Sequence, residues 1–169
     1  MSSLLSTDRA FPRDAAMLNG VISDTHGLMR PEALAALRGS DLIIHAGDVG
    51  SADIIEQLGA IAPTHAVRGN VDTQRWARAL PDTLIVEAAG LRFYLLHVRA
   101  ELAVDPVSAG YAAVIFGHSH KPSIEMRNGV LWLNPGSAGP RRFTLPVTIA
   151  RIRVTAHQLD PEILALEVR

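Results

Sequence analysis

Side chains that can hold metal ions recur along this chain directly after short apolar runs. Five segments supply them: "ISDTHG" at 22–27, "HAGD" at 45–48, "RGN" at 68–70, "LLH" at 95–97 and "GHSH" at 117–120. The candidate ligands are two aspartates, one asparagine and four histidines, namely Asp24, His26, Asp48, Asn70, His97, His118 and His120. Imidazole, carboxylate and amide groups are typical ligands of divalent transition metals. These residue types therefore predict metal-assisted chemistry.

The apolar runs that precede these side chains have the composition of β-strands. They span 17–23, 41–48, 65–70, 91–97 and 112–118. Segments 30–40 and 51–60 show helical periodicity. Pro31 suits a first helical turn, Ser51 suits an N-cap, and each segment has a glycine near its C-terminal end. Strands and helices alternate in the first half, which predicts parallel strands joined by helical crossovers.

The second half has the pattern of hairpins. Segments 81–97 and 122–136 each place a glycine-containing turn between two extended runs. We therefore expect antiparallel or mixed pairing there and assign the chain to the α/β class. In α/β sheets, bound molecules usually lie at the carboxyl ends of the strands. A single histidine at a strand end is usually structural, but five separate placements favour one shared site.

Composition narrows the class of protein further. The chain has 169 residues, of which 48% are apolar, and its net charge of −1 gives no general attraction to nucleic acid or to an anionic membrane. With no cysteine, disulfides and thiolate metal sites are excluded. No apolar run approaches the roughly 20 residues of a membrane helix, and the first residues lack a signal core, so we expect a cytoplasmic protein. We predict a flexible tail over 1–16 and a single domain over 17–169.

The ordered motifs resemble those of the calcineurin-like metallophosphoesterase superfamily. They are D-x-H at 24–26, G-D at 47–48, G-N-x-D at 69–72, H at 97 and G-H-x-H at 117–120. The following "NPGSAGPRR" at 134–142 resembles the small bacterial and archaeal phosphodiesterase branch. The resemblance covers residues 17–142. It implies a two-layer β-sandwich of mixed sheets flanked by helices, with two metal ions at its rim.

The resemblance also implies how the ligands are shared. One ion would take Asp24, His26, Asp48 and His120, and the other would take Asp48, Asn70, His97 and His118, so that Asp48 bridges. We expect Asp48, Asn70 and His118 to act directly in catalysis. If 117–120 is extended, His118 and His120 project to the same side and can reach different ions. Mn²⁺ is the favoured metal, with Fe²⁺, Zn²⁺, Ni²⁺ and Co²⁺ as alternatives.

The implied activity is the hydrolysis of a small phosphate ester, most simply a phosphodiester, by a metal-bridging hydroxide. Two divalent ions bring four positive charges, and Asp24 and Asp48 cancel two of them. A bridging hydroxide leaves about one net positive charge, which attracts a phosphate group.

Two positions depart from the superfamily pattern. Val71 stands where many members have the histidine thought to protonate the leaving group, so we predict slow turnover of esters with poor leaving groups. Arg99 stands in place of a second histidine in the usual H-G-H motif. Arg99 could contact phosphate, but a solvated surface arginine is the favoured interpretation.

Other polar residues are expected to support the site or the fold. We assign His45 a structural or ligand-orienting role, and Asn134 a role in shaping a loop near the site. Asp72 could orient a ligand or cap the segment that follows it. Segment 159–167 begins like a helix, yet we favour a closing strand there.

Two other functions remain open at this stage. One is a non-catalytic interaction scaffold like the small retromer subunit, which shares the fold but keeps only part of the ligand set. The other is a nuclease, but the chain has no basic cluster to hold nucleic acid. We expect neither a membrane nor nucleic acid as a partner, and a homo-oligomer stays open.

Overall fold

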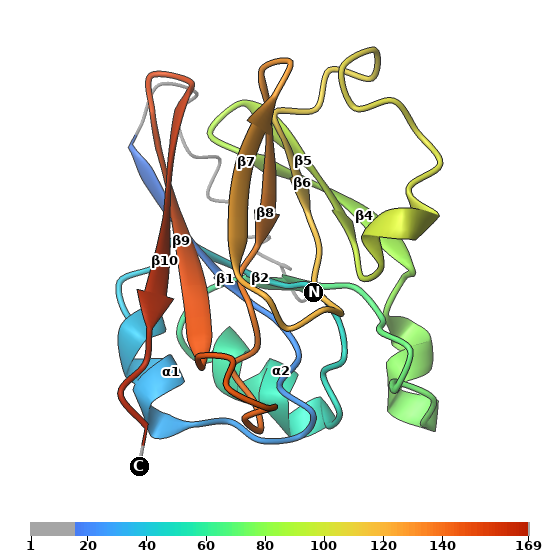
Figure 1. Ribbon diagram of the computed structural model, residues 1–169, viewed down its shortest axis with the longest axis vertical. Helices are drawn as coiled ribbons and strands as arrows, with labels where there is room; N and C mark the ends of the chain where they lie inside the picture. Colours follow the sequence, from blue (N-terminus) through green and yellow to red (C-terminus); the bar gives the residue numbers. More distant parts are fainter. Residues whose placement is uncertain (1–15, 169) are drawn as a thin grey trace, which may run out of the picture.

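Two five-stranded sheets face each other in the computed structural model, which describes residues 16–168 (Figure 1). Sheet A has the order β10-β9-β1-β2-β3, with β1 (Met17–Ile22), β2 (Leu42–His45), β3 (Thr64–Ala66), β9 (Thr148–Thr155) and β10 (Gln158–Ala165). Sheet B has the order β4-β5-β6-β8-β7, with β4 (Thr83–Ala88), β5 (Leu91–Leu96), β6 (Ala113–Ile115), β7 (Ser123–Arg127) and β8 (Val130–Asn134). The predicted sandwich of mixed sheets is confirmed.

Helical crossovers produce the parallel half of sheet A. Strands β1, β2 and β3 pair in parallel and are joined by α1 (Pro31–Leu37) and α2 (Ala52–Gly59). Pro31 begins α1, and the Ser51 hydroxyl accepts a hydrogen bond from the N–H of Asp53 at the start of α2, as predicted. Strands β2 and β3 end earlier than predicted, because the residues after them leave the sheet to form loops.

Sheet B combines two hairpins with parallel pairs. Strands β4 and β5 pair antiparallel, as do β7 and β8, whereas β6 lies parallel to both β5 and β8. Two 3₁₀ helices, η1 (Arg75–Ala79) and η2 (Arg99–Glu101), lie in the loops that connect strands. The mixed pairing confirms the expectation for the second half.

The closing strand predicted for 159–167 is present as β10, which pairs antiparallel with β9. Pro161 lies within β10 opposite Ile152. Because β10 is an edge strand of sheet A, the missing N–H of a proline is tolerated there. The helix-like start of this segment therefore does not determine its structure.

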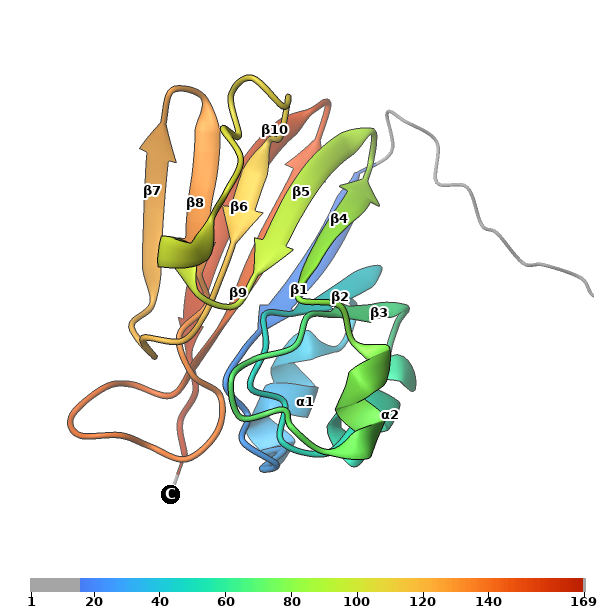
Figure 2. The same ribbon diagram turned by 90° about the vertical axis from the view of Figure 1, so that its right-hand side faces the viewer.

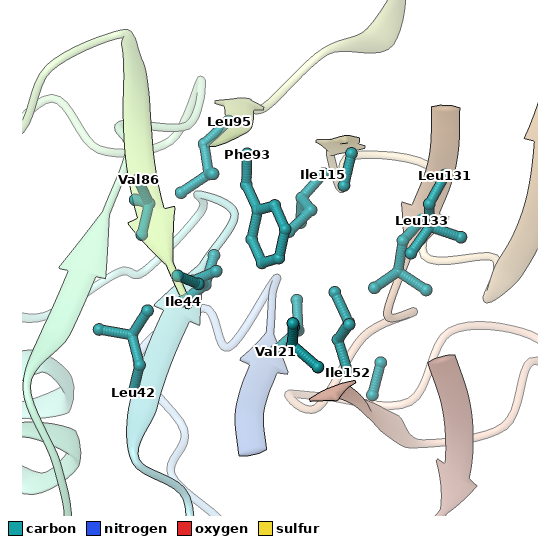
Figure 3. Close-up of a cluster of buried hydrophobic side chains, with 14 of the residues drawn as sticks. Val21, Leu42, Ile44, Val86, Phe93, Leu95, Ile115, Leu131, Leu133 and Ile152 are labelled. Atoms are coloured by element: carbon teal, nitrogen blue, oxygen red, sulfur yellow. The ribbon is translucent and has the colours of Figure 1, made fainter. Parts of the chain in front are cut away.

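The main core lies between the two sheets. Figure 3 shows Phe93 of β5 surrounded by side chains of both sheets, among them Ile44 and Ile152 from sheet A and Leu133 from sheet B. A second cluster joins the other face of sheet A to α1 and α2, and Ile43 of β2 belongs to it. Strand β2 is thus buried on both faces, which explains its continuous apolar run.

The two α-helices of the described residues both pack against sheet A (Figure 2). The outer face of sheet B instead carries a smaller cluster that contains Phe116, Trp132 and Leu102, the residue that follows η2. Within residues 16–168, no helix is long and apolar enough to cross a membrane. The predicted tail lies outside the described residues apart from Ala16, and the single-domain assignment stays a prediction.

Replacing Phe93 with alanine should lower the free energy of unfolding by about 3–5 kcal/mol, because the ring is fully buried between the sheets. Chemical denaturation monitored by circular dichroism measures this change. Phe143→Ala is the matched control, since that ring is 92% exposed, and its effect should stay within about 0.5 kcal/mol. Equal losses in the two variants would contradict the assignment of the core.

Candidate metal centre

All seven predicted ligands lie on loops that directly follow strands. Asp24 and His26 follow β1, Asp48 follows β2 and Asn70 comes after β3. The other three come from sheet B, where His97 follows β5 and both His118 and His120 follow β6. Backbone hydrogen bonds from Asp24 N–H to the Gly47 carbonyl and from His26 N–H to the Asp48 carbonyl tie the first two loops together. The site is therefore assembled from both sheets.

The first group of donors contains Asp24, His26 and His120. The Nε2 atoms of His26 and His120 are 3.2 Å apart. Asp24 Oδ1 lies 3.3 Å from His120 Nε2 and 3.8 Å from His26 Nε2. Three donor atoms from two sheets thus converge on one point.

The second group contains Asp48, His97 and His118, with Asn70 beside them. Asp48 Oδ2 is 3.1 Å from His97 Nε2. Asn70 Oδ1 lies 3.1 Å from His97 Nε2 and 3.2 Å from His118 Nδ1. Asp48 Oδ2 is also 3.7 Å from His26 Nε2 in the first group. Asp48 therefore lies between the two groups.

The buried carboxylate of Asp24 indicates that the site suits a cation. Its Oδ2 accepts hydrogen bonds from the Ser23 hydroxyl at 2.7 Å and from the His118 N–H at 3.2 Å. Its Oδ1 is buried and has no hydrogen-bond partner among the described residues. An unpaired buried carboxylate oxygen is costly. A divalent ion among the convergent donors would remove that cost, so the residues present fit a metal.

The protonation equilibria of the two aspartates point the same way. Burial raises the pKa of Asp24, and the negative charge of Asp48 raises it further, although Ser23 opposes this rise. For Asp48, burial alone would raise the pKa, but hydrogen bonds from His97 and from the Val71 N–H outweigh it and lower the pKa to about 2. Positive charge placed between the two carboxylates would favour ionisation of both.

The ring of His97 is oriented by the backbone. Its Nδ1–H donates to the Ala46 carbonyl at 2.7 Å, which leaves Nε2 facing Asp48 and Asn70. Burial would lower the pKa of His97, but the hydrogen bonds to Asp48 and to the Ala46 carbonyl raise it above its usual range. The hydrogen bond from His97 to the Ala46 carbonyl also joins the end of β5 in sheet B to the end of β2 in sheet A.

Five of the seven candidate ligands have left-handed backbone conformations. Their φ values are 54° for Asp24, 47° for His26, 54° for Asp48, 72° for His118 and 61° for His120. Such conformations are rare outside glycine and concentrate at functional sites. The expectation of an extended 117–120 segment is wrong, because left-handed turns, not a two-residue repeat, direct the two histidines to different groups.

Two glycines allow the loops to approach closely enough. A side chain at Gly69 would collide with the backbone and the carboxylate of Asp48. A side chain at Gly117 would collide with the Ser23 hydroxyl and lie 2.7 Å from Asp24 Oδ2. The glycines of "RGN" and "GHSH" are therefore required by space rather than by a positive φ.

Two further residues, Asp72 and Asn134, hold the ligand loops in place. The Asp72 carboxylate accepts hydrogen bonds from the N–H groups of Val49, Gly50 and Gly69, at 3.1, 2.9 and 2.8 Å respectively. Asp72 thus ties the loop of Asp48 to the loop of Asn70. This loop-holding role, and not the capping of the following segment, accounts for its carboxylate. Asn134 donates to the Gly117 carbonyl and the Ser119 hydroxyl, which supports the loop of His118 as expected.

His45 has the structural role predicted for it. Its Nδ1 accepts from the N–H of Gly47 at 3.2 Å, so Nε2 carries the proton and donates to the Thr25 hydroxyl at 2.9 Å. That hydroxyl donates in turn to the Val49 carbonyl at 2.8 Å. Burial, together with the nearby His97, lowers the pKa of His45 to about 3. A neutral His45 therefore fixes the residue between Asp24 and His26.

Arg99 differs from the solvated arginine that we favoured from the sequence. Its Nη2 lies 3.5 Å from Glu125 Oε2, and its guanidinium carbon lies 4.6 Å from the centre of the Trp132 ring. The side chain is only 34% exposed. No signal in the local sequence could reveal these contacts, because Glu125 and Trp132 follow 26 and 33 residues later.

Comparison with known proteins defines the family. Residues 17–157 match the calcineurin-like phosphoesterase superfamily domain, so this chain belongs to that superfamily. A probable metallophosphoesterase of Methanothermobacter thermautotrophicus is 36% identical over 160 residues, which cover 88% of this chain and 92% of the relative. A phosphodiesterase of Methanocaldococcus jannaschii is 29% identical over 136 residues, which cover 69% of this chain and 81% of the relative.

Solved structures share the fold. The structure of an archaeal phosphodiesterase matches with a TM-score of 0.74 at 27% identity and covers 89% of this chain and 100% of that chain. Vps29 of Cryptosporidium parvum matches with a TM-score of 0.72 at 17% identity and covers 89% of this chain and 98% of that chain. The second likeness shows the fold alone. The predicted resemblance to small microbial phosphoesterases is confirmed.

His45→Gln should make stability less dependent on pH. The pKa of His45 rises from about 3 in the folded protein toward 6.5 on unfolding, so its neutral form contributes stability above pH 6.5 that is lost as the pH falls toward 3. Between about pH 4 and 6, the slope of the free energy of unfolding against pH should be smaller in the variant than in the wild type, by up to about 1.4 kcal/mol per pH unit. Denaturant titrations with chelator present measure this slope. The exposed His157→Gln variant should keep the wild-type slope, and an unchanged slope in His45→Gln would refute the assignment.

Proposed function

We propose that this protein is a dinuclear metal-dependent phosphodiesterase. The observation that carries the proposal is the convergence of seven donor side chains in two groups, with the Asp48 carboxylate between them and the unpaired Asp24 Oδ1 directed into the first group. Membership of the superfamily and the relatives named as phosphodiesterases support the same activity. The substrate would be a small phosphate ester.

Each group would hold one divalent ion. Asp24, His26 and His120 would bind the first ion, and Asn70, His97 and His118 would bind the second. Asp48 would be shared by both. Two carboxylates with neutral imidazole and amide donors suit Mn²⁺, Fe²⁺, Co²⁺, Ni²⁺ or Zn²⁺, with Mn²⁺ proposed first.

A pair of bound divalent ions supplies positive charge that lowers the pKa of a water nucleophile and neutralises phosphoryl oxygens. The chain's own residues would position the substrate. Asn70 and His118 are exposed at the rim, where a substrate can reach them, whereas Asp24, Asp48 and His97 are buried. This difference in exposure would orient the phosphate toward the outer side of the site, with the leaving group in solvent or in a neighbouring pocket.

No imidazole stands at the position of a leaving-group acid. Val71 follows Asn70, is 42% exposed and uses its N–H to donate to Asp48 Oδ1 at 3.0 Å. Its isopropyl group cannot donate a proton. The departing alcohol would therefore take its proton from solvent.

The complete donor set argues against a pure scaffold. A scaffold gains nothing from five aspartate and histidine residues held in left-handed conformations around a common point. Hydrolysis of bis(p-nitrophenyl) phosphate with Mn²⁺, abolished by chelator, is the first test. A chain that binds no metal and hydrolyses none of a panel of phosphodiesters would end the proposal.

Asp48→Asn should impair both ions at once, because the amide keeps the shape but loses the shared negative charge. Metal analysis should show loss of both ions, and kcat/KM for bis(p-nitrophenyl) phosphate should fall about a hundredfold or more, since even outer contacts to metal ligands are worth 10–100-fold. His157→Ala is the control and should keep metal and activity, because His157 lies on the exposed turn between β9 and β10. Circular dichroism checks that the variant folds, and full activity of folded Asp48→Asn would refute the shared role.

Val71→His should relieve a dependence on the leaving group. For a series of methyl aryl phosphates, the wild-type rate should fall steeply as the pKa of the phenol rises, because no side chain protonates the departing oxygen. The histidine should raise the rate for the poorest leaving groups by about a hundredfold and flatten the plot of log kcat/KM against that pKa. Val71→Ala should keep the wild-type slope. A flat wild-type plot would show that another group acts as the acid.

A further inference from the structure

A pocket of about 400 Å³ opens beside His118 on the outer face of sheet B. Its lining includes Val98, Arg99, Phe116, His118, Lys121 and Ser123. This volume lies within the usual range of small-molecule sites, about 300–1,000 Å³. Because His118 belongs both to this pocket and to the second group of donors, a molecule bound at the centre can extend directly into the pocket.

Arg99 is held in one place on the wall of this pocket. Its guanidinium carbon lies 4.6 Å from the centre of the Trp132 ring and 5.3 Å from that of Phe116. Cation–π contacts of this kind fix the plane of the guanidinium group. Arg99 has therefore lost most of its side-chain freedom before any ligand binds, which lowers the cost of binding.

The charge of Arg99 is only partly neutralised. Its one side-chain hydrogen bond to the described residues goes from Nη2 to Glu125 Oε2 at 3.5 Å. The same carboxylate oxygen lies 3.0 Å from Nε of Arg127 and is thus shared. Lys121 adds a further positive charge to the pocket wall. A guanidinium group has five N–H donors, so most of those on Arg99 remain free for an oxyanion.

We propose that this pocket binds the alcohol part of the substrate and that Arg99 binds a second anionic group on that part, a carboxylate or a further phosphoryl group. The apolar walls from Val98 and Phe116 would contact the carbon skeleton between the two charged ends. The inference deepens the proposed function, because it takes the phosphate at the centre as given. The pocket would favour phosphate esters whose alcohol part carries a second anionic group over esters whose alcohol part is neutral or cationic.

Two pairs of ligands test this selection. 3-Phosphoglycerate carries a carboxylate where glycerol 3-phosphate carries a hydroxymethyl group, and fructose 1,6-bisphosphate adds a phosphoryl group to fructose 6-phosphate. Each is titrated into the Mn²⁺-loaded protein, with Trp132 fluorescence as the readout in a Trp76→Phe background, which leaves one of the two tryptophans. Competition with hydrolysis of bis(p-nitrophenyl) phosphate is measured in parallel.

The ligand with the second anion should bind about tenfold more tightly in at least one pair, as expected for one charge-assisted contact. The pair that shows the preference identifies the anion. Arg99→Gln should bring that ratio close to one. Arg127→Gln is the matched control, because it removes a cation from the same Glu125 carboxylate outside the pocket, and it should keep the ratio.

Ratios near one in both pairs for the wild type, or a ratio that Arg99→Gln leaves unchanged, would overturn the inference. The wild-type ratio decides by itself if Arg99→Gln does not fold. The two proposals fail separately. A tenfold preference without hydrolysis would remove the phosphodiesterase and keep the pocket, whereas hydrolysis with ratios near one would remove the pocket alone.

Discussion

The fixed position of the Asp48 carboxylate is the constraint on which the site depends. One oxygen accepts from the Val71 N–H, the other faces His97 at 3.1 Å, and Gly69 lies so close that a side chain there would collide with the carboxylate. Asp48 leaves β2 in a left-handed conformation, which turns its side chain between the two donor groups. Apolar clusters pack against both faces of β2, and this close packing holds the strand that leads into Asp48.

Gathering so many polar groups in a buried region is unfavourable unless each is satisfied. The protein meets this requirement with its own side chains. Asp72 accepts three backbone N–H groups, and His45 stays neutral and passes a hydrogen bond through Thr25. Two buried atoms of the candidate ligands are exceptions among the described residues, since neither Asp24 Oδ1 nor His120 Nδ1 has a hydrogen-bond partner. The unpaired Asp24 Oδ1 among convergent donors is the feature by which these loops suit a cation and differ from an ordinary polar core.

Much of the fold followed from local pattern, because strand runs, helix caps and glycine turns act over a few residues. The strands that carry the ligands and the closing strand β10 could be predicted in this way. Contacts made across the fold could not. The Val49 and Gly50 N–H groups on Asp72 and the ring beside Arg99 come from distant segments, and the residue types of His118 and His120 do not signal their left-handed conformations. Local sequence therefore indicated candidate donors but not the geometry that directs them.

The division of the donors between the two sheets has a consequence for biosynthesis. Sheet A supplies the donors of residues 24–70, and sheet B supplies those of residues 97–120. The first half of the chain carries both aspartates together with His26 and Asn70, whereas the other three histidines come from the second half. Each donor group is completed by a histidine of the 117–120 loop, so the full donor set can form only after both halves of the chain have been made.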